Sequence, residues 1–351
     1  SSLDSPQPPR APQGKPRRKW LLPVIIAAVL VVLGGSGALA YKFWYQNPKK
    51  VISDGFMHAI EAKSISYKVT AERKDTSMAV KVVLSGISRD GANSVDANVE
   101  VMSDGKTHAF KGSAVIDKKS NIYIKVANVD TLLAEFTATM PASVRQEVDA
   151  FIKKINDQWI VISNDKLKSF SESYAKSQEC LQKVSDTIQK DQSYSNELVD
   201  LYKKHPFFKI TKELGSKDGS LGYEVQGDKV EGKAFGEGLK NTKTYKLMHD
   251  CDSSFKIDTN NQDSSDEDST AQIWVSRWSH EITKITANEK GDDNSTTTVG
   301  VEPIFNKAPE VKTPANAKSV EDLMNDLQTL QMNIMEASLQ ESQAANGSLF
   351  S

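Results

Sequence analysis

The two cysteines, Cys180 and Cys251, are the residues of this chain best suited to covalent chemistry. In a chain that reaches an oxidising compartment, an even pair of cysteines indicates a disulfide, and two reduced, buried thiols are the alternative that the sequence leaves open. Cys180 lies on an expected helix and Cys251 in an expected loop, so a bridge would close a loop of about 70 residues and add up to about 4 kcal/mol of stability. A catalytic thiol needs an electropositive environment that stabilises its thiolate, whereas the acidic residues Asp250 and Asp252 flank Cys251. We therefore predict a structural disulfide rather than a nucleophile.

The histidines and acidic residues do not form a recognised metal motif. Zinc ligands come in close pairs, but the histidines stand singly, at His58, His108, His205, His249 and His280. Residues 258–270 (DTNNQDSSDEDST) offer the oxygen ligands that calcium prefers, yet they lack the spacing and the turn glycine of an EF-hand loop. We expect a solvated loop there, with a calcium site as the alternative, and we predict no metal and no other cofactor.

Motifs of the common catalytic classes are absent outside the apolar segment described below. The chain has no G-x-S-x-G elbow there, no P-loop and no G-x-G-x-x-G, and Gly236-Glu237-Gly238 lacks the third glycine. The formal net charge of −2 argues against a nucleic-acid partner, which would require a basic face. The sequence therefore favours a protein that is not an enzyme.

Four aromatic residues are candidates for lining an apolar ligand pocket. They are Trp159, Tyr223, Trp274 and Trp278. The alternative for each of them is an ordinary position in the core or at a sheet edge.

An apolar run near the N-terminus predicts a transmembrane helix. Residues 20–41 contain no charged residue, and about 20 apolar residues span a bilayer core as a helix. We therefore expect a disordered, proline-rich cytoplasmic tail over 1–19 and a membrane anchor over 20–45. More positive charges precede the run than follow it, which predicts a cytoplasmic N-terminus and places the bulk of the chain outside the cytoplasm, on the cell membrane. A signal peptide cleaved near Ala40, after the A-x-A pattern at 38–40, is the alternative.

The exported part, residues 48–305, reads as an α+β domain. Alternation of apolar and polar residues, interrupted by short turn signals such as 89–91 and 103–105, predicts an antiparallel meander. A helical insertion is expected over about 130–205. The expected strands are 65–71, 78–84, 95–101, two short stretches between 108 and 115, 122–126, 159–162, 207–213, 221–226, 272–277, 280–287 and 296–305. The expected helices are 51–62, 132–136, 142–155, 166–190, 197–204 and 228–239.

The C-terminal part consists of an expected linker over 306–317 and an amphipathic helix over 318–343. Ser319 and Asp322 form a capping box. Leu323, Leu327, Leu330 and Ile334 follow at alternating steps of four and three, which predicts a short apolar seam. The seam can pack on its own domain or bind a protein partner.

Three local segments, together with the order of elements, resemble a known fold family. They are Ile155-Asn-Asp-Gln-Trp-Ile-Val-Ile-Ser163, Ser220-Leu-Gly-Tyr-Glu-Val-Gln-Gly-Asp228 and Ile273-Trp-Val-Ser-Arg-Trp-Ser-His-Glu-Ile-Thr-Lys-Ile285. In these segments the chain resembles the LolA/LppX-type lipoprotein carriers, and in particular uncharacterised membrane-anchored proteins of Saccharibacteria-like bacteria. The resemblance covers about residues 48–305. It implies a curved antiparallel half-barrel sheet packed on helices, with an apolar cavity.

We therefore expect a single-pass, membrane-anchored protein that binds a lipid or another apolar ligand in a half-barrel cavity. Its expected partners are the membrane, through residues 20–45, a lipid, and a protein that contacts the helix over 318–343. One alternative is a non-catalytic structural or interaction module of the cell envelope with a filled core. The other is a secreted form of the same domain.

Overall fold

The computed structural model describes residues 47–103, 105–251, 253, 255–257, 270–290 and 295–347. The expected tail (1–19), the expected anchor (20–45) and most of the acidic stretch, residues 258–269, lie outside the described residues. Within the described ranges, no helix combines the length and the apolar character that crossing a membrane requires.

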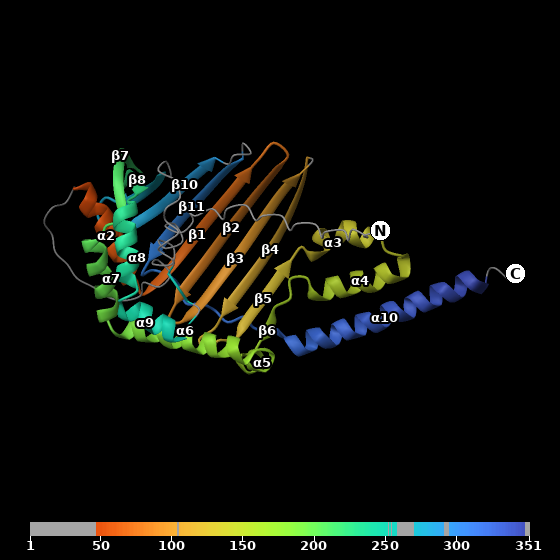
Figure 1. The fold of residues 1–351 in the computed structure, drawn as a ribbon. Coiled ribbons are helices and arrows are strands. Elements are labelled where there is room, and N and C mark those ends of the chain that lie inside the picture. The colour runs from red at the N-terminus through yellow and green to blue at the C-terminus, as the bar shows by residue number, and fades with distance from the viewer. Residues whose placement is uncertain are drawn as a thin grey trace, which may run out of the picture.

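The described strands form a single sheet of twelve, in the order β12-β6-β5-β4-β3-β2-β1-β11-β10-β9-β8-β7 (Figure 1). Neighbours pair antiparallel, except that β12 pairs parallel with β6. Their bounds are β1 (Ser64–Lys74), β2 (Met78–Arg89), β3 (Ala92–Ser103), β4 (Lys106–Ile116), β5 (Ile122–Ala127), β6 (Ile160–Ile162), β7 (Phe208–Lys217), β8 (Ser220–Gly227), β9 (Thr270–Ser276), β10 (Ile282–Lys290), β11 (Thr296–Phe305) and β12 (Lys318–Ser319).

The helices gather at the two ends of this sheet. Figure 1 shows α2, α7 and α8 at the β7–β11 end, and α3, α4 and α10 at the β5–β6 end, while α6 runs along one end of the middle strands. Their bounds are α2 (Pro48–Glu61), α3 (Val129–Ala138), α4 (Ala142–Ile155), α5 (Asn164–Phe170), α6 (Glu172–Lys190), α7 (Ser193–Lys204), α8 (Lys229–Leu239), α9 (Lys243–Cys251) and α10 (Val320–Gly347). The expected α+β class, with a large open antiparallel sheet packed against helices, is confirmed.

Four local details differ from the sequence prediction. The expected helix over 166–190 is two helices, because the backbone of Ser171 is extended between α5 and α6. The two short stretches between 108 and 115 are one strand, β4, which runs through Gly112. Cys251 is the last residue of α9 and not a loop residue, because Thr242 accepts a hydrogen bond from the amide of Tyr245 and so caps a helix. The first two residues of the expected helix over 318–343 form the short strand β12 instead, because they pair with β6, far away in the chain.

Helix α2 supplies the centre of the core. Asn47 caps it by accepting a hydrogen bond from the amide of Lys49, and Pro48 occupies the first turn, where its missing N–H costs little. Its buried stripe packs against α7 and strands β8–β11. The stripe consists of Val51, Ile52, Phe56, Ala59 and Ile60. Burying each large side chain of this stripe stabilises the fold by about 1.5–3 kcal/mol.

An aromatic cluster joins α2 to the helices beside it. The Phe56 ring lies 5.3 Å from those of Tyr202 and Phe208, and the Phe207 ring lies 4.8 Å from that of Phe235. Burial raises the pKa of the Tyr202 hydroxyl well above its ordinary value. Tilted and edge-on ring pairs of this kind contribute beyond their buried area, so α2, α7 and α8 behave as one packed unit.

Gly55 allows α2 to approach strand β10 closely. A Cβ atom at this position would lie 2.9 Å from Cγ1 of Ile282 and 3.1 Å from the carbonyl oxygen of His280. Beside it, Nδ1 of His280 lies 2.8 Å from Oδ2 of Asp54, which also pairs with Lys50. The helix is therefore held against the turn before β10 by both packing and polar contacts.

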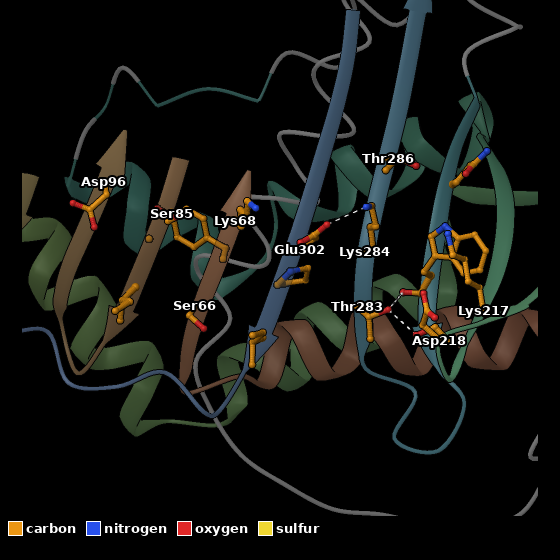
Figure 2. A pocket seen from close by; sticks show the side chains of 18 of the residues that line it. Ser66, Lys68, Ser85, Asp96, Lys217, Asp218, Thr283, Lys284, Thr286 and Glu302 are labelled. Atoms are coloured by element: carbon orange, nitrogen blue, oxygen red, sulfur yellow. Dashed lines mark hydrogen bonds and ion pairs between the residues drawn. The ribbon is translucent and has the colours of Figure 1, made fainter. Parts of the chain in front are cut away.

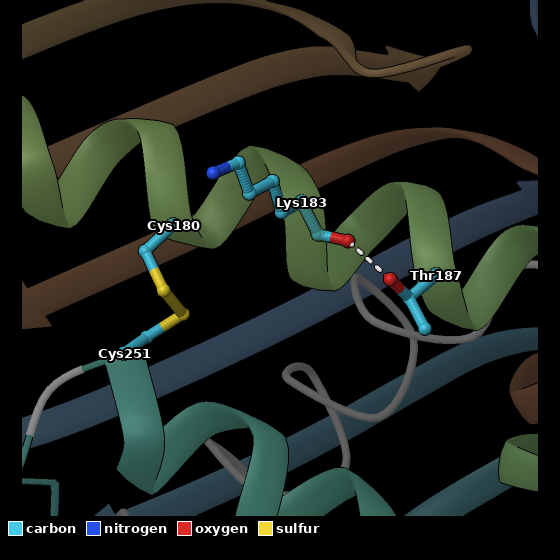
Figure 3. The surroundings of a disulfide bond; sticks show 4 residues. All are labelled: Cys180, Lys183, Thr187 and Cys251. Atoms are coloured by element: carbon cyan, nitrogen blue, oxygen red, sulfur yellow. Dashed lines mark hydrogen bonds between the residues drawn. A yellow bond between two sulfur atoms is a disulfide. The ribbon is translucent and has the colours of Figure 1, made fainter.

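The predicted disulfide between Cys180 and Cys251 is confirmed, and it ties α6 to α9 (Figure 3). The two Cα atoms are 5.3 Å apart, and 71 positions separate the residues in the sequence. Further along α6, the Thr187 hydroxyl donates to the carbonyl of Lys183. The bridge therefore fastens the long helical insertion to the part of the chain that follows β8.

Replacing Gly55 with valine should destabilise the fold by about 1–3 kcal/mol, because the added atoms meet β10 in a fully packed contact. The midpoint of urea unfolding measures the effect. Lys49→Val, on the exposed side of the same helix, controls for helix propensity. Equal stability of the two variants would show that α2 does not pack closely on β10.

Replacing both cysteines with serine should lower the free energy of unfolding by up to about 4 kcal/mol, because a 71-residue loop is then no longer closed in the unfolded chain. Thermal unfolding of wild type and variant, each with and without reductant, measures the loss. Reductant should lower the melting temperature of the wild type and leave that of the variant unchanged.

Candidate functional site

The strand register divides the side chains of the sheet between two faces. Directly opposed residues of an antiparallel pair share a face, and Ile65 of β1 pairs with Phe305 of β11, both buried under the helices. Alternation along the strands then assigns every second residue to this inner face, including Tyr67 and Val69. The residues between them, such as Ser66 and Lys68, lie on the opposite, outer face.

The inner face is largely covered over strands β8–β11. The side chains there belong to the same core as α2, α7 and α8, and each is at most 8% exposed. They are Tyr223, Val225, Ile273, Val275, Ile285 and Val301. These side chains form an ordinary hydrophobic core.

The inner face of β2–β5 is equally apolar but is not fully covered. Val82 pairs with Val99, and Val99 pairs with Phe110, so apolar side chains continue across the strands. Each residue of this set is at least partly exposed, and Ile124 and Val126 reach 42% and 40%. We name the set the open apolar face: Val80, Val82, Leu84, Val95, Val99, Val101, Phe110, Ile124 and Val126.

Tyr67 lies at the border between the covered and the open halves. Its ring rests on Gly86 of the neighbouring strand, since a Cβ atom there would lie 2.2 Å from Cζ of the tyrosine. Burial raises the pKa of the Tyr67 hydroxyl above its ordinary value. Because Gly86 has no side chain, the Tyr67 ring can pack directly on the backbone of β2, beside the helix-covered core.

The outer face carries a shallow polar trough of about 950 Å³, shown in Figure 2. Lys68 pairs with Glu302 on one side and with Ser85 on the other, and Ser85 pairs with Asp96. The Nζ atom of Lys284 donates to Glu302 at 3.0 Å. These five polar side chains therefore form one row across five neighbouring strands.

Of the four aromatic residues proposed from the sequence, Trp274 lines this trough. Tyr223 is 4% exposed in the core, and Trp278 is 77% exposed beside Arg277 in the turn after β9. Trp159 precedes β6, where Nζ of Lys125 lies 5.2 Å from its ring centre. The four do not meet at one place, and a ligand contact for any of them stays a prediction.

Two histidines, His205 and His280, each contact one acidic side chain. His280 contacts Asp54, as described above, and Nδ1 of His205 lies 2.9 Å from Oε2 of Glu231 in α8. The described residues contain no group of three or more histidine, cysteine or acidic side chains placed to hold a metal ion.

Helix α10 packs on α4 and leaves a second apolar stripe exposed. Asp326 accepts hydrogen bonds from both Lys154 and Lys318, and Asn333 donates to Glu147 of α4 at 2.7 Å. On the other side of the helix, five large apolar side chains are 42–60% exposed. They are Met324, Leu327, Met332, Met335 and Leu339.

The sequence did not identify the open apolar face or the polar row as sites. Alternation along each strand was visible, but the membership of a row depends on which strands pair. Lys68 and Glu302 become neighbours only because β1 pairs with β11. The sequence does show a lysine and a glutamate on two expected strands. Their opposite charges indicate a contact only once the pairing of these two strands is known.

No protein-family model matches the chain, and no curated protein matches it in sequence. Among solved structures, the lipoprotein LppX of Mycobacterium tuberculosis is similar, with a TM-score of 0.28 and 9% sequence identity, over 76% of this chain and 100% of that chain. So low a TM-score does not establish a common function. The function is therefore inferred from this chain's own residues.

Replacing Asp326 with asparagine should loosen α10 from α4. Hydrogen bonds from the ammonium groups of Lys154 and Lys318 hold the pKa of Asp326 below its ordinary value. A lowered folded pKa means that this contribution is present above the unfolded pKa of about 3.9 and is lost as the pH falls through the folded value. Amide hydrogen exchange over 320–340 should speed up in the variant at neutral pH.

The control for this variant is Glu336→Gln, which removes one negative charge from an exposed position of the same helix. It should leave exchange over 320–340 unchanged. Equal acceleration in both variants would mean that the total charge of α10, and not the contacts of Asp326, holds the helix.

Proposed function

We propose that this protein binds a lipid or another apolar ligand, whose hydrocarbon chain lies against the open apolar face of β2–β5. One observation carries the proposal: apolar side chains continue along the inner face from β8 to β5, yet the buried core includes only those of β8–β11 and the start of β1. Soluble domains rarely leave a wide apolar surface without a partner. The members of the set, from Val80 to Val126, are all apolar, which suits a hydrocarbon chain, and His108, which pairs with Val101, adds one polar side chain to the same face.

The proposed setting is the outside of the cytoplasmic membrane, with residues 20–45 as the anchor. The apolar run in the sequence supports the anchor. The disulfide between Cys180 and Cys251 supports an oxidising compartment, because such bonds persist mainly in exported proteins. The proposed role is binding rather than catalysis, and it agrees with the isolated, locally paired histidines among the described residues.

A second candidate function is the binding of a protein partner through α10. The observation that favours it is the exposed stripe of three methionines and two leucines opposite the face that packs on α4. Methionine is flexible and polarisable and is common on surfaces that adapt to a partner. The two functions use different surfaces, so each can be tested without the other.

The test of lipid binding is native mass spectrometry of the full chain, extracted gently from its own membrane. An apolar mass should accompany the wild type and leave on organic extraction. The double substitution Val82→Thr and Val99→Thr places two hydroxyl groups in the middle of the open apolar face while keeping the strand-forming shape of the side chains. It should weaken retention by roughly tenfold, which corresponds to about 1.4 kcal/mol.

Val83→Thr is the matched control, since it is the next residue of β2, is also partly buried and faces the opposite side of the sheet. It should retain the ligand like the wild type. A bare wild-type mass, or equal loss from Val83→Thr, would contradict lipid binding at this face.

A further inference from the structure

The outer face of the sheet carries a second recognition surface, the polar trough of Figure 2. It lies on the side of the sheet opposite the open apolar face, since Ser66 and Lys68 alternate with Ile65 and Tyr67. Its volume of about 950 Å³ is within the range of small-molecule sites, about 300–1,000 Å³. Most of the residues that line it carry polar side chains, so its chemistry differs from that of the proposed lipid surface.

An aromatic platform stands at one end of the polar row. Trp274 pairs with Lys284 on one side and with Gly222 on the other. A Cβ atom at Gly222 would lie 2.7 Å from Cζ3 of the indole, so the ring lies against the backbone of β8. A large ring held flat on a sheet presents its free face as a stacking surface.

A β-bulge in β10 shapes the part of the trough next to Trp274. The register between β9 and β10 shifts between Ile282 and Lys284, which leaves Thr283 as the extra residue. The Thr283 hydroxyl donates to the carbonyl of Trp274 at 3.2 Å and lies 3.0 Å from the hydroxyl of Ser220. Bulges re-aim side chains locally, and here the bulge places the Thr283 hydroxyl beside that of Ser220.

The charges of the trough balance. Its lining holds three lysines, Lys68, Lys217 and Lys284, and three acidic residues, Asp96, Asp218 and Glu302. The two signs alternate along the row, where Lys284 and Lys68 lie on either side of Glu302. A polyanion would meet Glu302 and Asp96, and a polycation would meet Lys284 and Lys68, so the arrangement favours a neutral ligand with many hydroxyl groups.

We propose that the trough binds a neutral, extended oligosaccharide laid across the strands, with one sugar ring stacked on Trp274. Neighbouring strands are about 4.8 Å apart, so each sugar unit of an extended chain meets one further polar side chain of the row. Lysine donates hydrogen bonds, carboxylates accept them, and serine hydroxyls do both, which matches the mixed needs of sugar hydroxyls. The row from Lys284 to Asp96 thus supplies successive partners for a short chain.

The experiment is isothermal titration of the full chain with cellohexaose and with the fully N-acetylated chitin hexamer, which are extended and neutral. Maltohexaose, which coils, and hexagalacturonate, which is anionic, are the comparison probes. At least one of the extended neutral sugars should bind at millimolar concentrations or below. Trp274→Ala should weaken its binding by about tenfold or more, because the stacking surface is lost.

Trp278→Ala is the control, because this tryptophan is more exposed but lies outside the trough. It should bind like the wild type. Glu302→Gln keeps the shape of the side chain and removes the charge, so it should weaken binding even if Trp274→Ala proves unstable. Binding of neither extended sugar, a response to hexagalacturonate alone, or equal loss in Trp278→Ala would overturn the proposal.

Discussion

The packing of α2 and its neighbouring helices on strands β8–β11 is the interaction on which the rest of the structure depends. A sheet of this width presents far more apolar surface on its inner side than three helices can cover. Burial of Phe56, Ile60 and their neighbours is favourable at one end only, so the core forms there. The apolar side chains of β2–β5 on the same face stay partly exposed.

The other contacts hold the helices at the ends of the sheet. The disulfide ties α6 to α9, and the pairs of Asp326 with Lys154 and Lys318 hold α10 beside α4 and β12. Surface ion pairs of this kind contribute little stability individually. Their role here is to fix the position of α10. They keep α10 extended away from the sheet, as Figure 1 shows, so the inner face of the middle strands stays open.

The two faces of the middle strands offer two different chemistries. Successive residues of a strand point to opposite faces of the sheet. In the middle strands, valine, leucine and phenylalanine side chains therefore lie on the inner face, and the serine, lysine and acidic side chains between them lie on the outer face. The same strands therefore present an apolar surface on one face and a polar surface on the other, and each side chain belongs to only one of them.

The sequence by itself determined the local elements and the cysteine pair. Alternation marked most strands, the apolar stripe of residues 51–60 marked α2, and the even cysteine count indicated the disulfide, because each of these signals depends on neighbouring residues or on composition alone. Only the tertiary structure decided which half of the inner face is covered and which polar side chains form a row. Both depend on the pairing of β1 with β11 and on the end of the sheet where α2 docks. Those are contacts between residues far apart in the chain, and no local pattern encodes them.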